Sequence, residues 1–125
     1  METVSNAERL ESIKSMQSTI GKLENGLAQM TQKGANTTLI TKRLTASYIG
    51  LAALESVWNQ KPHDYTQEDL AEARKVLTSL FPSIKSSYAK VKAGSPQRTL
   101  LERRIKALEL VVQAIDDLSG QDLPH

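Results

Sequence analysis

The sequence predicts an all-α protein, an up-down-up-down four-helix bundle. Apolar residues recur at steps of three and four along most of the chain, and no stretch alternates apolar and polar residues as a half-buried strand does. The helical stretches are separated by short connections, which make consecutive helices antiparallel neighbours. The length of 125 residues fits one domain with a hydrophobic core of its own. We therefore expect a single helical domain over residues 1–125.

The first helix is expected over residues 6–32. Ser5 and Glu8 have the spacing of a capping box, in which the side chains of the N-cap and of the third helical residue satisfy free backbone N–H groups. Gly21 lies inside the helix and costs about 0.5–1 kcal/mol relative to alanine, so packing is expected to hold this helix rather than propensity. Gly34 is expected to end it.

The second and third helices are expected over residues 36–59 and 66–93, separated by a polar loop. Asn36 is the expected N-cap of the second helix. Pro82 lies inside the third helix, where a proline removes a hydrogen bond and clashes with the preceding turn. We expect a kink or a short break near residues 79–81.

Two capping patterns begin the remaining helices. Thr66 and Asp69 form a capping box for the third helix, with Asp in place of the usual Glu. The fourth helix is expected over residues 96–119, with Ser95 as its N-cap and a proline at its first position, where the missing N–H costs nothing. The apolar stripes of the last three helices predict a set of core residues. These are Leu44, Leu51, Leu77, Leu80, Ile84, Ile105, Leu108, Val112 and Ile115.

The pattern of Thr38–Gln60 returns 61 positions later at Thr99–Gln121. This similarity predicts two duplicated αα-hairpins, about residues 5–60 and 66–120, related by an approximate two-fold axis. The open alternative is chance similarity between two amphipathic helices rich in Leu and Ala. The matched positions include Thr38/Thr99, Leu39/Leu100, Arg43/Arg104, Ala46/Ala107 and Ala53/Ala114.

Residues with the chemistry of an active site are scarce. The chain has no cysteine, and its two histidines are His63, beside a proline in the loop, and His125, the last residue. No Glu-x-x-His pair, nucleophile elbow or phosphate-binding loop occurs. We therefore expect no enzyme activity, no cofactor and no metal site. The chain is similar in length and architecture to histidine phosphotransfer domains, but that family presents a histidine on an exposed helix face, and this chain does not.

The length and helix order also resemble those of bacteriocin immunity proteins and flagellar export chaperones. That resemblance rests on no motif, so no functional residue carries over from either family. It implies a small cytosolic helical protein that works by contact with another protein. The N-terminal residues do not form a secretory signal, and no apolar run approaches the ~20 residues of a membrane span, so we expect a cytoplasmic location.

The charges are unevenly distributed, although the net charge is only +2. In an up-down-up-down bundle the first and third turns share one end, and that end is expected to be basic. Its cations are Lys33, Lys42, Arg43, Lys85, Lys90, Lys92, Arg98, Arg103, Arg104 and Lys106. The opposite end is expected to be acidic, with Glu2, Glu8, Glu11, Glu55, Asp64, Glu68, Asp69, Glu72, Asp116, Asp117 and Asp122.

Some of these charges oppose the dipoles of their own helices. Two basic pairs, Lys42/Arg43 and Arg103/Arg104, are expected near positive helix N-termini. Three acids, Glu55, Asp116 and Asp117, are expected near negative C-termini, and each misplaced charge costs about 0.3–1 kcal/mol at low salt. Pairing with neighbouring helices, or solubility alone, is the favoured explanation of this arrangement, and a basic end that receives an acidic partner is the alternative. The candidate residues for an anionic partner are Lys42, Arg43, Arg98, Arg103, Arg104 and Lys106.

The favoured function is a non-enzymatic adaptor that acts by protein–protein contact. Spare apolar surface on the second and fourth helices would also allow a homodimer. The alternative is binding of nucleic acid or another anionic surface through the basic end. Nucleic acid is the weaker alternative, because the basic excess is small and aromatic residues for stacking are almost absent.

Overall fold

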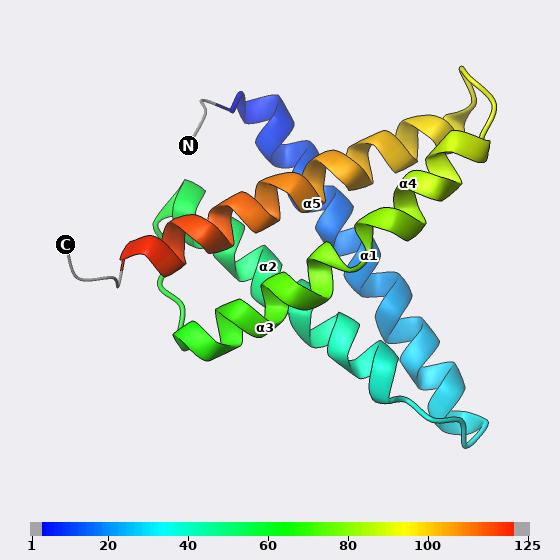
Figure 1. Cartoon of the computed structure of the whole chain (residues 1–125), viewed down its shortest axis with the longest axis horizontal. Helices are drawn as coiled ribbons and strands as arrows, with labels where there is room; N and C mark the ends of the chain where they lie inside the picture. Colours follow the sequence, from blue (N-terminus) through cyan, green and yellow to red (C-terminus); the bar gives the residue numbers. More distant parts are fainter. Residues whose placement is uncertain (1–3, 122–125) are drawn as a thin grey trace.

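A computed structural model describes residues 4–121, and this part of the chain is all-α, with no strand (Figure 1). The described residues form five helices. They are α1 (Asn6–Gln32), α2 (Thr38–Asn59), α3 (Gln67–Thr78), α4 (Phe81–Lys90) and α5 (Pro96–Gln121).

Side-chain caps begin α1 and α3 at positions 61 residues apart. The Ser5 hydroxyl accepts a hydrogen bond from the Glu8 N–H (3.2 Å), and the Thr66 hydroxyl accepts one from the Asp69 N–H (3.0 Å). The Asp69 carboxylate in turn accepts from the Thr66 N–H (3.0 Å), which completes a capping box. The Glu8 carboxylate accepts from the Ser5 hydroxyl instead (3.1 Å). Both N-caps are confirmed, and only the second is reciprocal.

The turn between α1 and α2 differs slightly from the expectation. Gly34 ends α1 as predicted, with a φ of 71° that a glycine adopts without strain. The start of α2 at residue 36 was wrong, because the helix begins at Thr38 and its N-cap is Thr37. Asn36 still satisfies a free donor at this end, since its side-chain oxygen accepts from the Thr38 N–H (2.9 Å).

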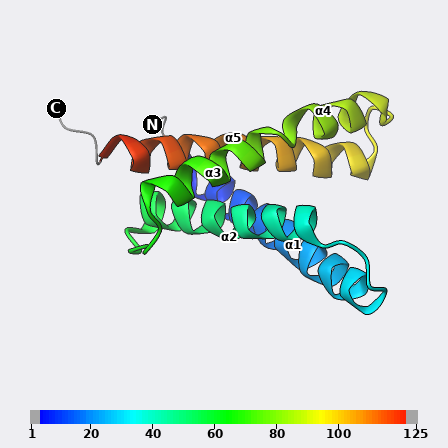
Figure 2. The same ribbon diagram turned by 60° about the horizontal axis from the view of Figure 1, so that its bottom comes forward.

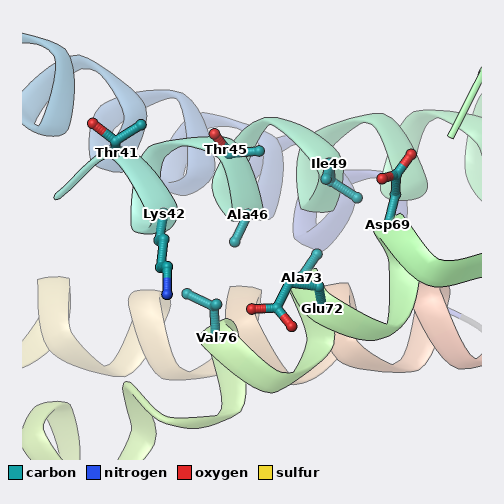
Figure 3. A pocket seen from close by; sticks show the side chains of 9 residues that line it. All are labelled: Thr41, Lys42, Thr45, Ala46, Ile49, Asp69, Glu72, Ala73 and Val76. Atoms are coloured by element: carbon teal, nitrogen blue, oxygen red, sulfur yellow. The ribbon is translucent and has the colours of Figure 1, made fainter. Parts of the chain in front are cut away.

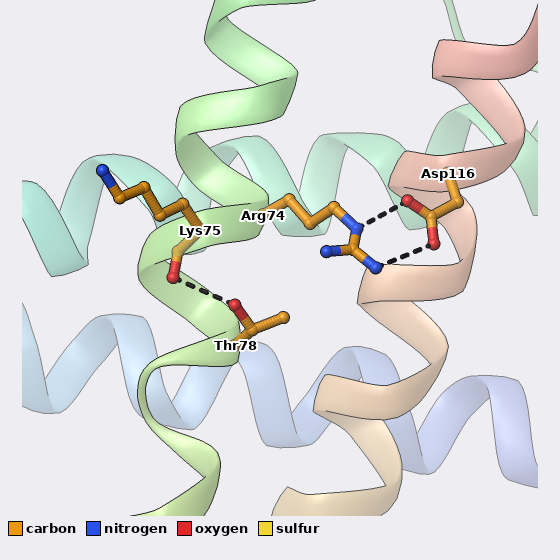
Figure 4. Close-up of polar contacts among 4 residues, drawn as sticks. All are labelled: Arg74, Lys75, Thr78 and Asp116. Carbon is orange, nitrogen blue, oxygen red and sulfur yellow. Dashed lines mark hydrogen bonds and ion pairs between the residues drawn. The ribbon is translucent and has the colours of Figure 1, made fainter.

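The expected third helix is broken into α3 and α4, with the break at the predicted place. Pro82 lies in the first turn of α4, where no intrahelical partner for its nitrogen is needed. Before the break, the Thr78 hydroxyl donates to the Lys75 carbonyl (3.1 Å; Figure 4). The second half ends at Lys90, not at residue 93, and Gly94 in the following turn has a φ of 82°.

The helices form two hairpins that lie in two layers (Figure 2). One layer is α1 with α2, and the other is α3 and α4 with α5. The central helices are α2, which packs against α1, α3 and α5, and α5, which packs against all the others. The layers are in contact where α3 begins and diverge toward the α1–α2 and α4–α5 turns (Figures 1 and 2). These contacts are consistent with a four-helix bundle in which α3 and α4 together take the place of one helix.

A close approach at Gly50 brings α2 against α5. A Cβ atom at this position would lie 2.7 Å from a methyl carbon of Val111 and 3.2 Å from one of Leu77. Val111 and Leu77 are fully buried, and a β-branched valine has little rotamer freedom to move away. Because position 50 has no side chain, the backbone of α2 can lie close against Val111 of α5 and Leu77 of α3.

The predicted core is partly right. Leu44, Leu77, Leu108 and Ile115 are buried as expected. Five others are only half-buried. Of these, Leu51, Leu80 and Ile84 still pack against the core, whereas the predictions for Ile105 and Val112 were wrong. Leu80 and Ile84 lie at the α3–α4 junction and in α4, where α5 is the only described helix packed against this segment. The faces of the two side chains that point away from α5 are therefore open to solvent. On α5, Leu110 and Val111 are buried in addition to Leu108 and Ile115, because all four other helices pack against this helix.

The buried positions of the two hairpins coincide at the 61-residue offset. Six pairs on α2 and α5 are buried in both halves, namely 46/107, 47/108, 49/110, 50/111, 53/114 and 54/115. The same holds for Ser12 with Ala73 and for Met16 with Leu77 on the first helix of each hairpin. The internal similarity of the sequence thus corresponds to equivalent packing in three dimensions.

Candidate functional site

The divergence of the layers divides the expected basic end into two regions. Lys42 and Arg43 are on α2 near the α1–α2 turn, whereas Arg98, Arg103 and Arg104 are on α5 near the α4–α5 turn (Figure 1). The two turns lie far apart in both views of the molecule. Of the expected acidic residues, Glu2 and Asp122 lie outside the described part of the chain.

A groove of about 440 Å³ separates α1 from the first turns of α5. We call it the α1/α5 groove. From α1 it is lined by Glu11, Lys14, Ser15, Ser18 and Lys22. From α5 it is lined by Leu100, Arg103 and Arg104. In both helices the spacing of three and four residues puts these side chains on one face, and the packing of α1 against α5 brings the two faces together.

Cations dominate the α1/α5 groove. Four of its lining residues are basic and one, Glu11, is acidic. Arg103 Nε lies 3.9 Å from a Glu11 carboxylate oxygen, and both side chains are about half exposed, so this ion pair is loose. Arg104 makes no ion pair with any described residue, and its Nε atom is buried without a hydrogen-bond partner. The groove therefore has unused capacity to bind negative charge.

A smaller hollow of about 190 Å³ continues the groove toward the start of α1 and shares Glu11 and Arg103 with it. Lys106, one of the candidate residues, lines this hollow. Three carboxylates surround it, from Glu8, Glu11 and Glu102, so the hollow is not a basic site. The attraction for anions is concentrated in the α1/α5 groove itself.

Arg98, another candidate residue for an anionic partner, makes its contacts with residues at the α4–α5 turn. Its guanidinium donates to the Val91 carbonyl (3.0 Å) and lies 4.2 Å from the centre of the Tyr88 ring. The Tyr88 hydroxyl donates in turn to the Glu102 carboxylate (2.8 Å). Since Arg98 is not among the residues lining the groove, we assign it to the stability of the turn.

Lys42 lines a second groove, of about 230 Å³, between α2 and α3 (Figure 3). We call it the α2/α3 groove. Figure 3 shows Lys42 extending from α2 toward α3, from which Asp69 and Glu72 also line the groove. Its floor is apolar, with Ala46, Ile49, Ala73 and Val76. Arg43 is half-buried beside Lys42 on the same helix.

Nearby cations, one in the α2–α3 loop and one on α3, pair some of the charges that oppose helix dipoles. On the acidic side, a Glu55 carboxylate oxygen lies 3.0 Å from Lys61 Nζ, and Asp116 is held by two nitrogens of Arg74 at 2.7 and 3.4 Å (Figure 4). The hydrogen bond to Asp116 and its negative charge raise the pKa of Arg74. Asp117 has no ion pair among the described residues. Pairing therefore accounts for two of these three acids.

The basic residues that were expected to oppose helix dipoles are paired less closely than the acids. Of the residues in the two basic pairs, only Arg103 has an ion pair within the described part of the chain, and that pair is the loose contact with Glu11. Lys42, Arg43 and Arg104 have none. The pairing that offsets the misplaced acids thus does not offset the misplaced cations.

The sequence did not identify every residue of the α1/α5 groove. Lys14 and Lys22 complete its basic lining from α1, and Leu100 adds an apolar side chain that is 58% exposed. The available signal was the polar stripe of α1 at residues 11, 14, 15, 18 and 22, which the helical period puts on one side. The sequence could not show that this stripe faces α5.

The remaining polar residues form no cluster typical of a catalytic centre. His63 lies in the α2–α3 loop, where its Nδ1 accepts from the Tyr65 N–H (3.2 Å) and its ring stacks on Tyr65. Among residues 4–121, no group of His, Asp and Glu side chains is arranged to hold a metal ion. None of the described helices combines the length and the apolar character needed to cross a membrane. His125 lies outside the described residues.

Comparison of the chain with protein-family models, with curated proteins and with solved structures gives no match.

Proposed function

We propose that this chain is a non-catalytic binding protein that contacts an acidic segment of a partner protein through the α1/α5 groove. The observation that carries the proposal is the difference in pairing between misplaced charges. Glu55 and Asp116 have close cationic partners, whereas Arg104 has none and Arg103 has only a distant one. Arg103 and Arg104 are the eighth and ninth residues of α5, beyond the first turn in which the helix dipole acts. What they lack among the described residues is a close partner, which an anionic ligand would supply.

The composition of the groove favours a protein segment as the acidic partner. Leu100 exposes 58% of its surface beside the two arginines, and Ser15 and Ser18 offer hydroxyl donors on the facing helix. A segment with carboxylates and one apolar residue would satisfy both kinds of surface. Nucleic acid would use the charges but has little need of an exposed leucine. Binding of nucleic acid or another anionic surface is therefore the outcome that the experiment must separate from the proposal.

We further propose that the fold is a four-helix bundle made from two duplicated hairpins, residues 5–60 and 66–120. The coincidence of buried positions at the 61-residue offset supports this origin. Self-association and a cytoplasmic location stay predictions.

The test is the double substitution Arg103→Gln and Arg104→Gln. The probe is a fluorescently labelled synthetic peptide in which Glu and Leu repeat at helical spacing, and its anisotropy measures the dissociation constant. Each exposed charge contributes about 0.5–1 kcal/mol, so binding should weaken roughly 5- to 30-fold. The difference from the wild type should shrink as salt is added, because exposed charges are screened over about 8–10 Å.

A matched control removes the same charge elsewhere. Lys90→Gln and Lys92→Gln change two exposed lysines outside the groove and should leave peptide binding within about twofold of the wild type. A labelled DNA duplex that binds tighter than the peptide would favour the anionic-surface alternative. Thermal melting checks the fold: because the Arg103–Glu11 pair is exposed and distant, removing it should cost at most about 1 kcal/mol. A larger loss would mean that the arginines serve the fold.

A further inference from the structure

The smaller hollow that continues the α1/α5 groove differs from it in charge, and we call it the acidic hollow. The two share Glu11 and Arg103, whose charges offset each other. The charged residues that line only the groove are all basic, namely Lys14, Lys22 and Arg104. Those that line only the acidic hollow are two acids and one cation, namely Glu8, Glu102 and Lys106. The surface between α1 and α5 is therefore basic in the groove and acidic toward the start of α1.

The two acids of the acidic hollow have hydrogen bonds but no cationic partner. Glu8 accepts from the Ser5 hydroxyl (3.1 Å), and Glu102 accepts from the Tyr88 hydroxyl (2.8 Å). Neither carboxylate forms an ion pair with a described residue, and Lys106 forms none either, although it lines the same hollow. Both carboxylates are therefore available to a cation from outside the chain.

Ser12 adds a third polar group to the acidic hollow. It lines the hollow and is only 3% exposed, and its side chain forms no hydrogen bond with a described residue. The equivalent position in the second hairpin, Ala73, is buried without a hydroxyl, so packing does not require one here. A buried hydroxyl without a partner is unfavourable, and a donor placed in the hollow would remove that cost.

We propose that the acidic hollow binds a lysine of the same partner segment whose carboxylates bind in the α1/α5 groove. This inference rests on the proposed function, and it narrows the partner to a segment that carries both signs of charge. An ammonium group has three donors, and Glu8, Glu102 and Ser12 offer it three acceptors. The carboxylates of the segment lie against Lys14, Lys22 and the arginines. Nucleic acid has no cation to place in the hollow.

The test compares labelled peptides that differ at one end only. The parent is the Glu- and Leu-containing peptide, and in its derivatives a terminal Glu is replaced by Lys or by Gln, at either end. Because the groove is basic as a whole, charge alone predicts that a Lys peptide binds less tightly than the matching Gln peptide. We expect the reverse at one end, with the Lys peptide bound about two- to fivefold more tightly by fluorescence anisotropy.

Three variants of the protein locate this preference for lysine. Glu8→Gln with Glu102→Gln removes both charges but keeps an acceptor oxygen at each position, and it should abolish the preference. Ser12→Ala should reduce the preference, and the fold should tolerate it because Ala73 occupies the equivalent position. Lys106→Gln should increase the preference, since it removes a cation that lines the acidic hollow and not the groove.

The control is Asp64→Asn with Glu68→Gln, which removes two exposed acids outside the groove and the acidic hollow and should leave the preference unchanged. Circular dichroism should show the same helical content in every variant. A Lys peptide bound less tightly than the Gln peptide at both ends, or a preference that survives Glu8→Gln with Glu102→Gln, would overturn the lysine site. Binding of the parent peptide would then leave the proposed function standing, whereas failure of every peptide to bind would overturn both.

Discussion

The first hairpin and the second bury equivalent positions, yet their first helices differ in continuity. Helix α1 runs unbroken over 27 residues, whereas α3 ends after 12 and α4 continues for 10 more. The deciding positions are Gly21 and Pro82, which correspond at the 61-residue offset. Glycine keeps its N–H and tolerates the helix, but proline cannot continue the hydrogen-bond ladder. The comparison teaches that the apolar pattern decides what is buried, while a single backbone constraint decides whether the helix is continuous.

The largest expected effect tests the equivalence of the two hairpins within their shared core. Met16 and Leu77 correspond in sequence and are 1% and 0% exposed. Met16→Ala and Leu77→Ala should each lower the free energy of unfolding by about 2–5 kcal/mol, through lost burial and the cavity left behind. Urea denaturation measures both. Leu39→Ala and Leu100→Ala are the exposed controls, expected within about 0.5 kcal/mol of the wild type. A large cost in only one hairpin would break the equivalence.

The second effect tests the crossing of α2 and α5, where Gly50 and Val111 are equivalent positions in contact. Gly50→Ala should destabilise the protein by about 1–3 kcal/mol, because the added methyl group would overlap Val111 and crowd Leu77. Adding Val111→Ala gives the methyl group space, so the double variant should be more stable than the sum of the two single costs implies. Thermal or urea unfolding of all four proteins measures this coupling. Simple additivity would show that the two residues do not compete for space.

A smaller effect separates the two helix caps. Thr66→Ala removes the hydroxyl from a complete capping box and should cost about 1 kcal/mol, within the range of about 0.5–2 for lost N-caps. Ser5→Ala should cost somewhat more, because it removes both the acceptor of the Glu8 N–H and the donor to the Glu8 carboxylate, whereas Thr66→Ala leaves the Asp69 bond to the backbone N–H in place. Chemical denaturation gives both values, and Thr66→Ser should retain most of the stability. A greater cost at Thr66 would contradict the difference described between the caps.

The smallest effects concern the two positions that set helix continuity, and they should have opposite signs. A Cβ atom at Gly21 would meet no atom within 4 Å, so Gly21→Ala should stabilise α1 by about 0.5–1 kcal/mol. Pro82 fits the first turn of α4 and restricts the unfolded chain, so Pro82→Ala should lower stability by about 0.4–1 kcal/mol. The midpoints of urea unfolding compare the two variants. Shifts of the same sign would mean that something other than the local backbone decides continuity.

The sequence by itself determined the helical class, the N-caps at Ser5 and Thr66, the end of α1 at Gly34 and the break before Pro82. These features depend on residues within one or two turns of each other, so their hydrogen bonds and backbone preferences can be read locally. The repeat was also visible, since matching residues at a fixed offset need no structure to be seen.

Only the tertiary structure decided which residues of α5 are buried and which side chains share a groove. The helical period places residues on a face, but it does not fix how far a helix is rotated or at what angle it crosses its neighbour. The contact of Gly50 with Val111 sets that arrangement for α2 and α5. The resulting divergence of the two hairpins separates Lys42 from Arg103, and brings Lys14 and Lys22 of α1 to the arginines of α5.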